Sequence, residues 1–224
     1  MPTPTPAPAA PAAPQLSAQQ QFILQSFNSE IYVSNRMDIQ DTPLYDTFQY
    51  AAGTSFGTLQ AQWFSAVGPG QGKTYAQTNL TQPQKLAAPE AFAIFGYSLR
   101  YQENISLLDI YNLLYNFCFE FWMGQKAYQR GPFWLYCAGG GIFGTSNQSY
   151  TATTGTVLNN GNPGRSDMHR LGINAVIENQ MTFFGQLTGG TITLNASGTG
   201  ITAQCVLRGA GPEGRSGGVP GLQL

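Results

Sequence analysis

The chain has 224 residues, and charged residues make up only 9 % of them, against about 25 % in an ordinary soluble domain. This length fits one domain that buries a large core without disulfides or metals. The net charge is −1 and the ten lysines and arginines are scattered, so we expect no specific nucleic-acid site. A surface so poor in charge favours burial between neighbouring subunits; solvation by the many Gln, Asn, Ser and Thr side chains is the alternative.

Targeting signals are not visible in the sequence. No apolar run approaches the roughly 18 residues that a membrane span needs. The N-terminus lacks the charged and apolar regions of a signal peptide. We therefore expect the chain to be made in the cytoplasm.

Both ends of the chain have a biased composition. Residues 1–14, MPTPTPAPAAPAAP, contain six prolines and cannot bury enough apolar surface to fold alone, so they predict an extended, polyproline-like segment. We place a Pro/Ala-rich N-terminal arm at residues 1–20, a β-barrel domain at 21–210 and a Gly-rich C-terminal arm at 211–224. Residues 15–27 have a helical pattern that predicts a short helix or an adapter leading into the first strand.

The first half of the domain reads as strands separated by a long loop. Alternating apolar residues predict strands at 31–33, 45–52 and 92–101, with a loop-rich region over residues 53–88. Residues 106–116, SLLDIYNLLYN, have their apolar side chains at helical spacing. They predict one or two helical turns between two strands.

The most aromatic part of the chain is residues 111–144. Within it, residues 117–123 alternate apolar and mixed side chains, which predicts a strand. Gly131 and Pro132 are expected to end that strand, because proline cannot donate to a ladder and glycine weakens one. Residues 133–137, FWLYC, then predict a second, short apolar strand.

The C-terminal half predicts more strands. Residues 145–170 read as a long polar loop. Residues 178–180 predict a turn between strands at 172–177 and 181–187. Residues 196–200 predict a second hairpin, between strands at 191–195 and 201–208. In these strands apolar and polar side chains alternate, and turn residues lie at their ends. Many strands, Gly-rich turns and one or two short helices favour an all-β sandwich or barrel.

No catalytic, cofactor-binding or metal-binding signature is present. His169 is the only histidine and is interpreted as a polar residue at a strand edge, because no Gly-X-Ser-X-Gly turn accompanies it. The segment from Gly68 to Thr74 ends in Gly-Lys-Thr, but Val67 stands where the first glycine of a phosphate-binding loop should be. The three cysteines lack Cys-X-X-Cys spacing and lie in apolar, strand-like contexts; we expect buried free thiols at positions 118, 137 and 205.

Aromatic and acidic residues leave two alternatives open. Trp63, Trp122 and Trp134 could line a sugar site, although an aromatic stripe at strand spacing more often belongs to a core. A pair of catalytic carboxylates can come from distant strands, and the eleven acidic residues offer no specific candidate. Lys126, Arg130 and Arg165 are interpreted as contacts at a subunit rim.

Five motifs follow one another from residue 92 to about residue 210: FAIFGYSLRY, LLDIYNLLYN, FWMGQKAYQRGPFWLYCAGGGIFG, INAVIENQMTFFGQLTG and ITAQCVLRG. Their order resembles that of the motifs in the single jelly-roll capsid proteins of tailless, membrane-containing icosahedral phages. The third contains a Gly-X-Lys-X-Tyr-X-X-Gly-Pro pattern followed by three glycines. The last two are similar to the closing strands of those proteins. The two arms have no counterpart in the resemblance.

The resemblance implies a single jelly-roll sandwich or barrel with one or two short helices, and the composition of the chain ends adds extended terminal arms. The resemblance implies a structural virion protein without catalysis, which self-assembles into trimeric or hexamer-like capsomers of an icosahedral shell. Its expected partners are copies of itself, other capsid proteins and an underlying membrane surface. The N-terminal arm, predicted from its composition, is expected to lie on a neighbouring subunit. The alternatives are a lectin-like or adhesin-like β-sandwich that binds glycans through aromatic residues and, third, a glycoside-active enzyme.

Overall fold

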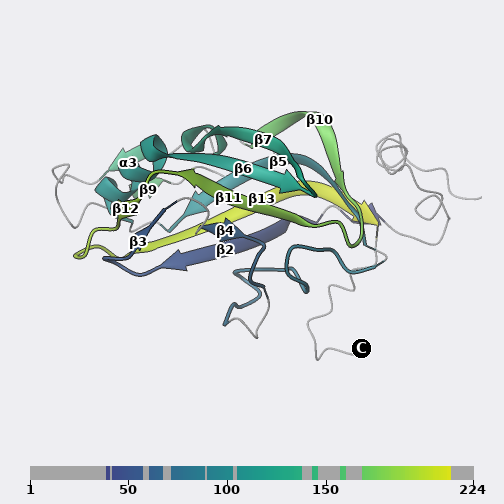
Figure 1. Cartoon of the computed structure of the whole chain (residues 1–224), viewed down its shortest axis with the longest axis horizontal. Coiled ribbons are helices and arrows are strands. Elements are labelled where there is room, and N and C mark those ends of the chain that lie inside the picture. Colours follow the sequence, from purple (N-terminus) through teal and green to yellow (C-terminus); the bar gives the residue numbers. More distant parts are fainter. Residues whose placement is uncertain are drawn as a thin grey trace, which may run out of the picture.

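The described residues form two main antiparallel β-sheets stacked on each other, two small two-stranded sheets and one short α-helix (Figure 1). This arrangement comes from a computed structural model that describes residues 39–40, 42–57, 61–67, 72–88, 90–102, 105–137, 143–145, 157–159 and 168–212. The predicted all-β, sandwich-like class is therefore confirmed. The N-terminal arm, the helical pattern at 15–27 and the strand at 31–33 lie outside the described residues, as does the C-terminal arm beyond Pro212.

The described elements follow one another along the chain with few long connections. Their bounds are β1 Ile39–Gln40, β2 Leu44–Tyr50, β3 Ser55–Phe56, β4 Gln62–Trp63, β5 Phe92–Tyr101, α3 Leu107–Asn116, β6 Phe117–Met123, β7 Lys126–Pro132, the 3₁₀ helix η2 Phe133–Tyr136, β8 Phe143–Thr145, β9 Val157–Asn159, β10 His169–Ile177, β11 Phe183–Gly189, β12 Ile192–Thr193 and β13 Ile201–Pro212.

The strands pair in a regular order that joins distant parts of the chain. One sheet runs β2-β13-β5-β10, with the short β1 beside the end of β13, and the other runs β4-β11-β6-β7. Without β1, these two sheets contain eight strands, which in chain order are β2, β4, β5, β6, β7, β10, β11 and β13. The first of the eight pairs with the eighth, the second with the seventh, the third with the sixth and the fourth with the fifth. The chain therefore behaves as one long hairpin folded over on itself.

Aromatic side chains fill the space between the two sheets. Phe119 and Phe121 of β6 are fully buried, as their period-two spacing predicts. Phe119 contacts the rings of Trp63, Tyr97 and Tyr136, with centroids 5.7, 5.9 and 4.8 Å away. These tilted and edge-on arrangements are the ones that aromatic rings prefer.

Helix α3 closes one end of the sandwich and leads directly into β6. The predicted helix at 106–116 is confirmed within one residue. Ile110 and Leu113 are buried against the core. Asp109 in the first turn accepts a hydrogen bond from the backbone N–H of Asn195 at 2.9 Å, so the helix start is tied to the segment that leads into β13.

The predicted strand that Gly131 and Pro132 were expected to end is in fact two strands. β6 ends at Met123, and β7 runs back antiparallel from Lys126. Gly124 has φ of +57°, which a glycine adopts without the steric cost that other residues meet. The prediction missed this hairpin because β7 lacks a clear apolar face: its residues are alternately exposed and half-buried.

The segment predicted as a strand at 133–137 is the 3₁₀ helix η2. Phe133 and Tyr136 are buried, and residues three apart lie on the same side of a 3₁₀ turn. A run of five apolar residues has no period that separates a strand from a short helix. The strand prediction was therefore wrong.

Both C-terminal hairpins were also predicted wrongly, although their strands exist. β10 pairs with β5 and β11 pairs with β6 and β4, so the tight turn at 178–180 carries the chain from one sheet to the other. Likewise β12 pairs with β3, whereas β13 pairs with β2 and β5. The polar segment 145–170 begins at the last residue of β8 and contains β9, which pairs with β8. Residues 146–156 and 160–167 lie outside the described part.

Replacing Phe119 by alanine should lower the free energy of unfolding by about 3–5 kcal/mol, because a fully buried aromatic ring leaves a cavity between the sheets. Phe121→Ala should cost a similar amount. Urea denaturation at neutral pH measures both. Cys118→Ala, on the exposed face of the same strand, is the matched control and should change stability by less than about 0.5 kcal/mol. Near-neutral values for both phenylalanine variants would contradict the observed core.

Candidate functional site

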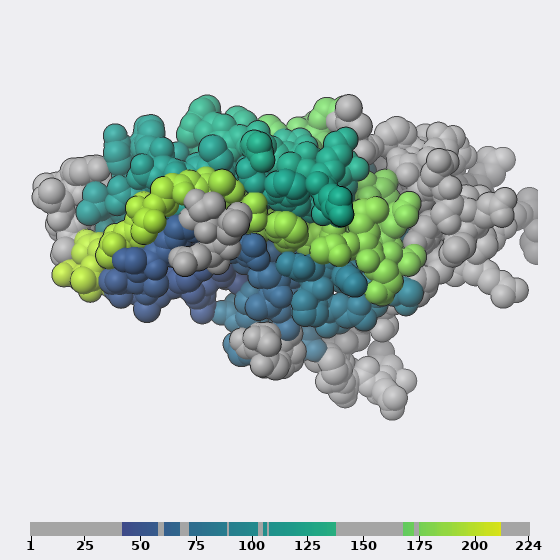
Figure 2. All heavy atoms as spheres, viewed as in Figure 1, coloured from purple at the N-terminus to yellow at the C-terminus, as the bar shows by residue number. Residues whose placement is uncertain are grey.

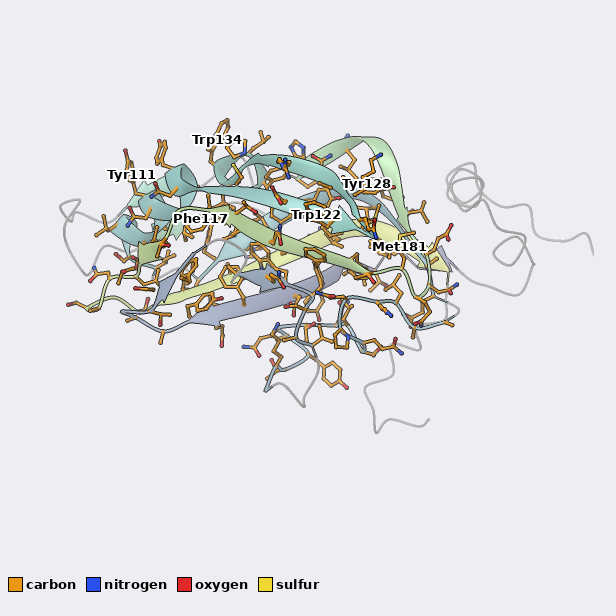
Figure 3. The ribbon with its side chains drawn as sticks, in the orientation of Figure 1. Tyr111, Phe117, Trp122, Tyr128, Trp134 and Met181 are labelled. Atoms are coloured by element: carbon orange, nitrogen blue, oxygen red, sulfur yellow. The ribbon has the colours of Figure 1, made fainter. Side chains whose placement is uncertain are left out.

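Most of the large apolar side chains that are exposed come from one stretch of the chain. Of six such residues in the described part, only Tyr75 lies elsewhere. The other five form what we call the aromatic edge: Tyr111, Tyr115, Tyr128, Trp134 and Leu135. Figure 3 shows Tyr111, Trp134 and Tyr128 in a row along one long edge of the molecule, and Figure 2 shows the teal stretch that carries them along the same edge.

The two tyrosines of α3 are exposed because the helix buries its opposite face. Tyr111 and Tyr115 are four residues apart and so lie on one side of the helix. Their rings contact each other at 4.5 Å between centroids. Tyr115 is 68 % exposed. The pair therefore presents a continuous aromatic surface that the protein's own core does not use.

The 3₁₀ helix η2 presents Trp134 and Leu135 because Tyr136 holds it in place. Tyr136 is buried, and its hydroxyl donates to Gln129 Oε1 of β7 at 3.3 Å. Its ring packs edge-on against His169 at 4.7 Å. With Tyr136 fixed inside, the preceding Trp134 stays 55 % exposed. Since η2 contacts both α3 and β7, its exposed side chains connect the two ends of the aromatic edge.

Beside the aromatic edge, the outer face of the second sheet carries a compact polar cluster around Glu120. This carboxylate accepts hydrogen bonds from Trp122 Nε1 and Gln186 Nε2, each at 2.9 Å. It also forms an ion pair with Arg130, whose Nε lies 2.7 Å from Glu120 Oε1. Burial raises the pKa of Glu120, but these hydrogen bonds and the charge of Arg130 outweigh it, so the pKa lies below its ordinary value. Trp122 in turn stacks parallel to Phe184.

The lysine of the Gly-Lys-Thr segment has a structural partner. Lys73 Nζ lies 2.8 Å from Oδ1 of Asp46, which is fully buried. Asp46 also accepts from the backbone N–H of Phe64 at 2.6 Å, a residue held at φ +68°. Burial raises the pKa of Asp46, although Lys73 and the Phe64 N–H act in the opposite direction. The ammonium is thus bound to the core, and residues 68–71 lie outside the described part.

On the outer face of the first sheet, an open pocket of about 220 Å³ surrounds Arg100. Its other polar lining comes from β2, β13, the loop before β5 and the residue after β5, and consists of Thr47, Gln77, Gln102, Thr202 and Gln204. None of the described residues in this lining is a carboxylate. No sequence pattern predicted this pocket, because Arg100 stands in a segment whose pattern indicates only a strand.

The sequence-level interpretation of His169 agrees with its position at the start of β10, opposite Tyr97. The ring is half-buried, and burial lowers its pKa. None of the described hydroxyls or carboxylates hydrogen-bonds to it. All three cysteines are free, as predicted, but only Cys137 and Cys205 are buried. Cys118 is exposed because it lies on the outer face of β6, so that part of the prediction was wrong.

The three tryptophans considered for a sugar site do not share a surface. Trp63 is fully buried and donates its Nε1–H to the carbonyl of Ala203 at 2.9 Å. Trp122 belongs to the Glu120 cluster and Trp134 to the aromatic edge. Of the cationic residues interpreted as rim contacts, Arg130 pairs with Glu120, Lys126 lies over the ring of Tyr128 at 5.0 Å, and Arg165 lies outside the described part.

The described residues contain neither a metal-binding cluster nor a membrane-spanning helix. No group of three or more His, Cys, Asp and Glu side chains is placed there to hold a metal ion. Nor does this part of the chain contain a helix long and apolar enough to cross a membrane.

Comparisons with known proteins give no relative. No family model matches the chain, and neither the curated proteins nor the solved structures contain a match. Any statement of function must therefore come from the surfaces described above.

Glu120→Gln should destabilise the protein by about 1–2 kcal/mol at pH 7, because a charged acceptor of three donors is lost. The folded-state pKa lies below the ordinary 4.5. The carboxylate therefore stabilises the fold above pH 4.5, and this contribution disappears as the pH falls through the lower, folded-state value. The difference in unfolding free energy between wild type and variant, measured in urea from pH 7 to 3, should shrink accordingly. Glu178→Gln, which replaces an exposed acid, is the control for the loss of one surface charge.

Lys73→Met should destabilise the protein by about 3 kcal/mol at pH 7, because it leaves the buried Asp46 carboxylate without its partner. Because the pKa of Asp46 is raised in the folded state, protonation should relieve the defect and the variant should gain stability as the pH falls towards 5. Urea denaturation at pH 7.5 and 5 measures this. The double variant with Asp46→Asn carries no charge there and should lose the pH dependence. Wild-type stability of Lys73→Met at pH 7.5 would show that the pair does not hold the loop.

Proposed function

We propose that this chain is a structural virion protein, a capsid subunit that self-assembles into trimeric or hexamer-like capsomers of an icosahedral shell. The observation that carries the proposal is the aromatic edge. Tyrosine and tryptophan are enriched at protein interfaces, and they dominate the binding energy where they are buried. A monomeric protein would leave these five side chains in water; a shell subunit covers them with its neighbours.

The low charge of the chain supports the same function. Charged residues are depleted at the centre of interfaces, and here they amount to 9 % of the sequence. Two of the cations nearest the aromatic edge already have partners, because Arg130 pairs with Glu120 and Lys126 lies over the ring of Tyr128. A neighbour that packs on this edge would therefore bury few unpaired charges.

The sandwich belongs, in this proposal, to the single jelly-roll type. A jelly roll has eight strands in two sheets and two Greek keys. Pairing of the first strand with the eighth, the second with the seventh, the third with the sixth and the fourth with the fifth is what a long hairpin produces when it wraps into two layers. The strand pairs of this chain follow that order. Jelly rolls occur in viral capsids and in lectins, so the fold alone does not choose between them.

The partners and location follow from the same proposal. The subunit would contact copies of itself, other capsid proteins and an underlying membrane surface within the virion, without catalysis and without a specific nucleic-acid site. The N-terminal arm would bind a neighbouring subunit. Because the arm is tethered to the assembly, its effective concentration at that subunit would be high, which strengthens the binding. The alternative is a lectin-like or adhesin-like protein in which the exposed aromatic rings contact sugars.

The untagged protein should form concentration-dependent oligomers, and Trp134→Ser should dissociate them. Each buried aromatic anchor is worth about 2 kcal/mol or more in an interface, or about 30-fold in the dissociation constant. Sedimentation over a concentration series measures the effect. Tyr75→Ser is the matched control, because Tyr75 is 52 % exposed but lies outside the aromatic edge. Deleting residues 1–14 should also weaken assembly while leaving the fold intact.

A wild-type protein that stays monomeric at high concentration, with or without residues 1–14, would contradict the capsid proposal. In that case, binding to a glycan panel that is lost in Trp134→Ser would support the lectin-like alternative. Oligomers that Trp134→Ser and Tyr75→Ser weaken equally would show that assembly does not use the aromatic edge.

A further inference from the structure

The pocket around Arg100 lies on the opposite layer of the sandwich from the Glu120 cluster. In the register of the first sheet, Gln204 of β13 stands between Thr47 of β2 and Arg100 of β5. The residues on either side of Gln204 in the chain, Ala203 and Cys205, are buried. Since side chains alternate along a strand, this row of three faces outward, into the pocket.

One wall of the pocket is a loop that is firmly attached to the sheet. Thr47 Oγ1 donates to the carbonyl of Gln77 at 2.8 Å, and Gln204 Nε2 donates to the carbonyl of Ala76 at 3.1 Å. The Lys73–Asp46 ion pair holds the start of the same loop. The pocket is therefore a preformed feature, as ligand sites usually are.

Arg100 has no counter-charge and no hydrogen-bond partner among the described residues. Its Nε is buried without a partner among the described residues, and none of the described side chains that line the pocket is acidic. A buried donor without a partner costs free energy, and in native structures it often marks the place of a water or an ion. The described residues therefore supply no hydrogen-bond acceptor for the guanidinium of Arg100.

The remaining polar groups of the pocket offer mostly donors. The Gln102 amide is fully engaged, since it donates to the carbonyl of Gly200 and accepts from the N–H of Thr202. Gln77 Oε1 accepts from the N–H of Thr74 at 2.9 Å, which leaves the Gln77 Nε2 donors without a described partner. The Thr202 hydroxyl likewise has no hydrogen-bond partner among the described residues. These groups could complete the shell of an anion held by Arg100.

We infer that the Arg100 pocket binds an oxyanion, a carboxylate or phosphate group, with Arg100 as the charged ligand and Gln77 Nε2 and the Thr202 hydroxyl as neutral donors. The planar guanidinium matches two oxygens of such a group. A volume of about 220 Å³ is smaller than the roughly 300–1,000 Å³ of a drug-sized site. It therefore accepts one oxyanion and a short attachment, with the rest of the ligand outside the open mouth.

The site is tested by thermal unfolding of the full chain titrated with sodium phosphate, sodium acetate or, for ionic strength, sodium chloride. We expect phosphate or acetate to raise the Tm saturably and chloride to have no such effect; which of the two acts at lower concentration identifies the group. Arg100→Gln should abolish this shift without lowering the Tm in the absence of anion, because Arg100 makes no described hydrogen bond. Arg170→Gln, an exposed arginine on β10 of the same sheet, should respond like wild type.

If Arg100→Gln does not fold, Gln77→Ala and Thr202→Val replace it. Each removes one neutral donor and should weaken anion binding by about tenfold, as expected for the loss of a hydrogen bond to a charged group. The inference is overturned if neither anion shifts the Tm more than chloride does. It is also overturned if Arg100→Gln, or both replacement variants, bind like wild type, or if Arg170→Gln loses binding to the same extent.

Discussion

The packing of aromatic rings between the sheets is the interaction on which the rest of the structure depends. Phe119 of β6 contacts Tyr136 of η2 and Trp63 of β4, so one ring joins three elements, of which β4 is far from the other two in the chain. Because Tyr136 is fixed in this core, η2 cannot turn its other side inward, and Trp134 remains exposed. The packing of the core therefore also determines which side chains are exposed at the aromatic edge.

The sequence predicted well those elements whose own side chains record their burial. The strand at 92–101 and the helix ending at Asn116 match the structure. The strand is a mostly apolar run that is buried on both faces, and the helix has its apolar side chains at helical spacing. The sequence did not predict which strands pair with each other, because a strand's own side chains do not identify its neighbour in the sheet. The turns at 178–180 and 196–200 each join two strands, but a period-two pattern does not tell which strand lies alongside. Only the sheet order shows that these turns pass between layers or sheets.

The candidate sites were harder to predict than the fold, for the same reason. Asp46 and Lys73 meet because β2 and the following loop are folded together, and no motif relates a buried acid to a lysine 27 residues later. Arg100 stands out only when the lining of its pocket is known to lack an acid. By contrast, the aromatic run at 111–144 was visible in the sequence, but its composition alone did not separate buried Phe119 from exposed Tyr115.

The position of the aromatic edge also limits the kind of contact that it can make. β7 ends its sheet among the described strands, and an open edge strand can add a strand from another molecule. Here it carries exposed Lys126, Arg130 and Pro132, and charges and proline on an edge oppose such pairing. Neighbours that cover the aromatic edge would therefore meet side chains rather than extend the sheet. In the proposed shell, contacts of that kind would fix the angle between subunits through the shape of Trp134 and its neighbours.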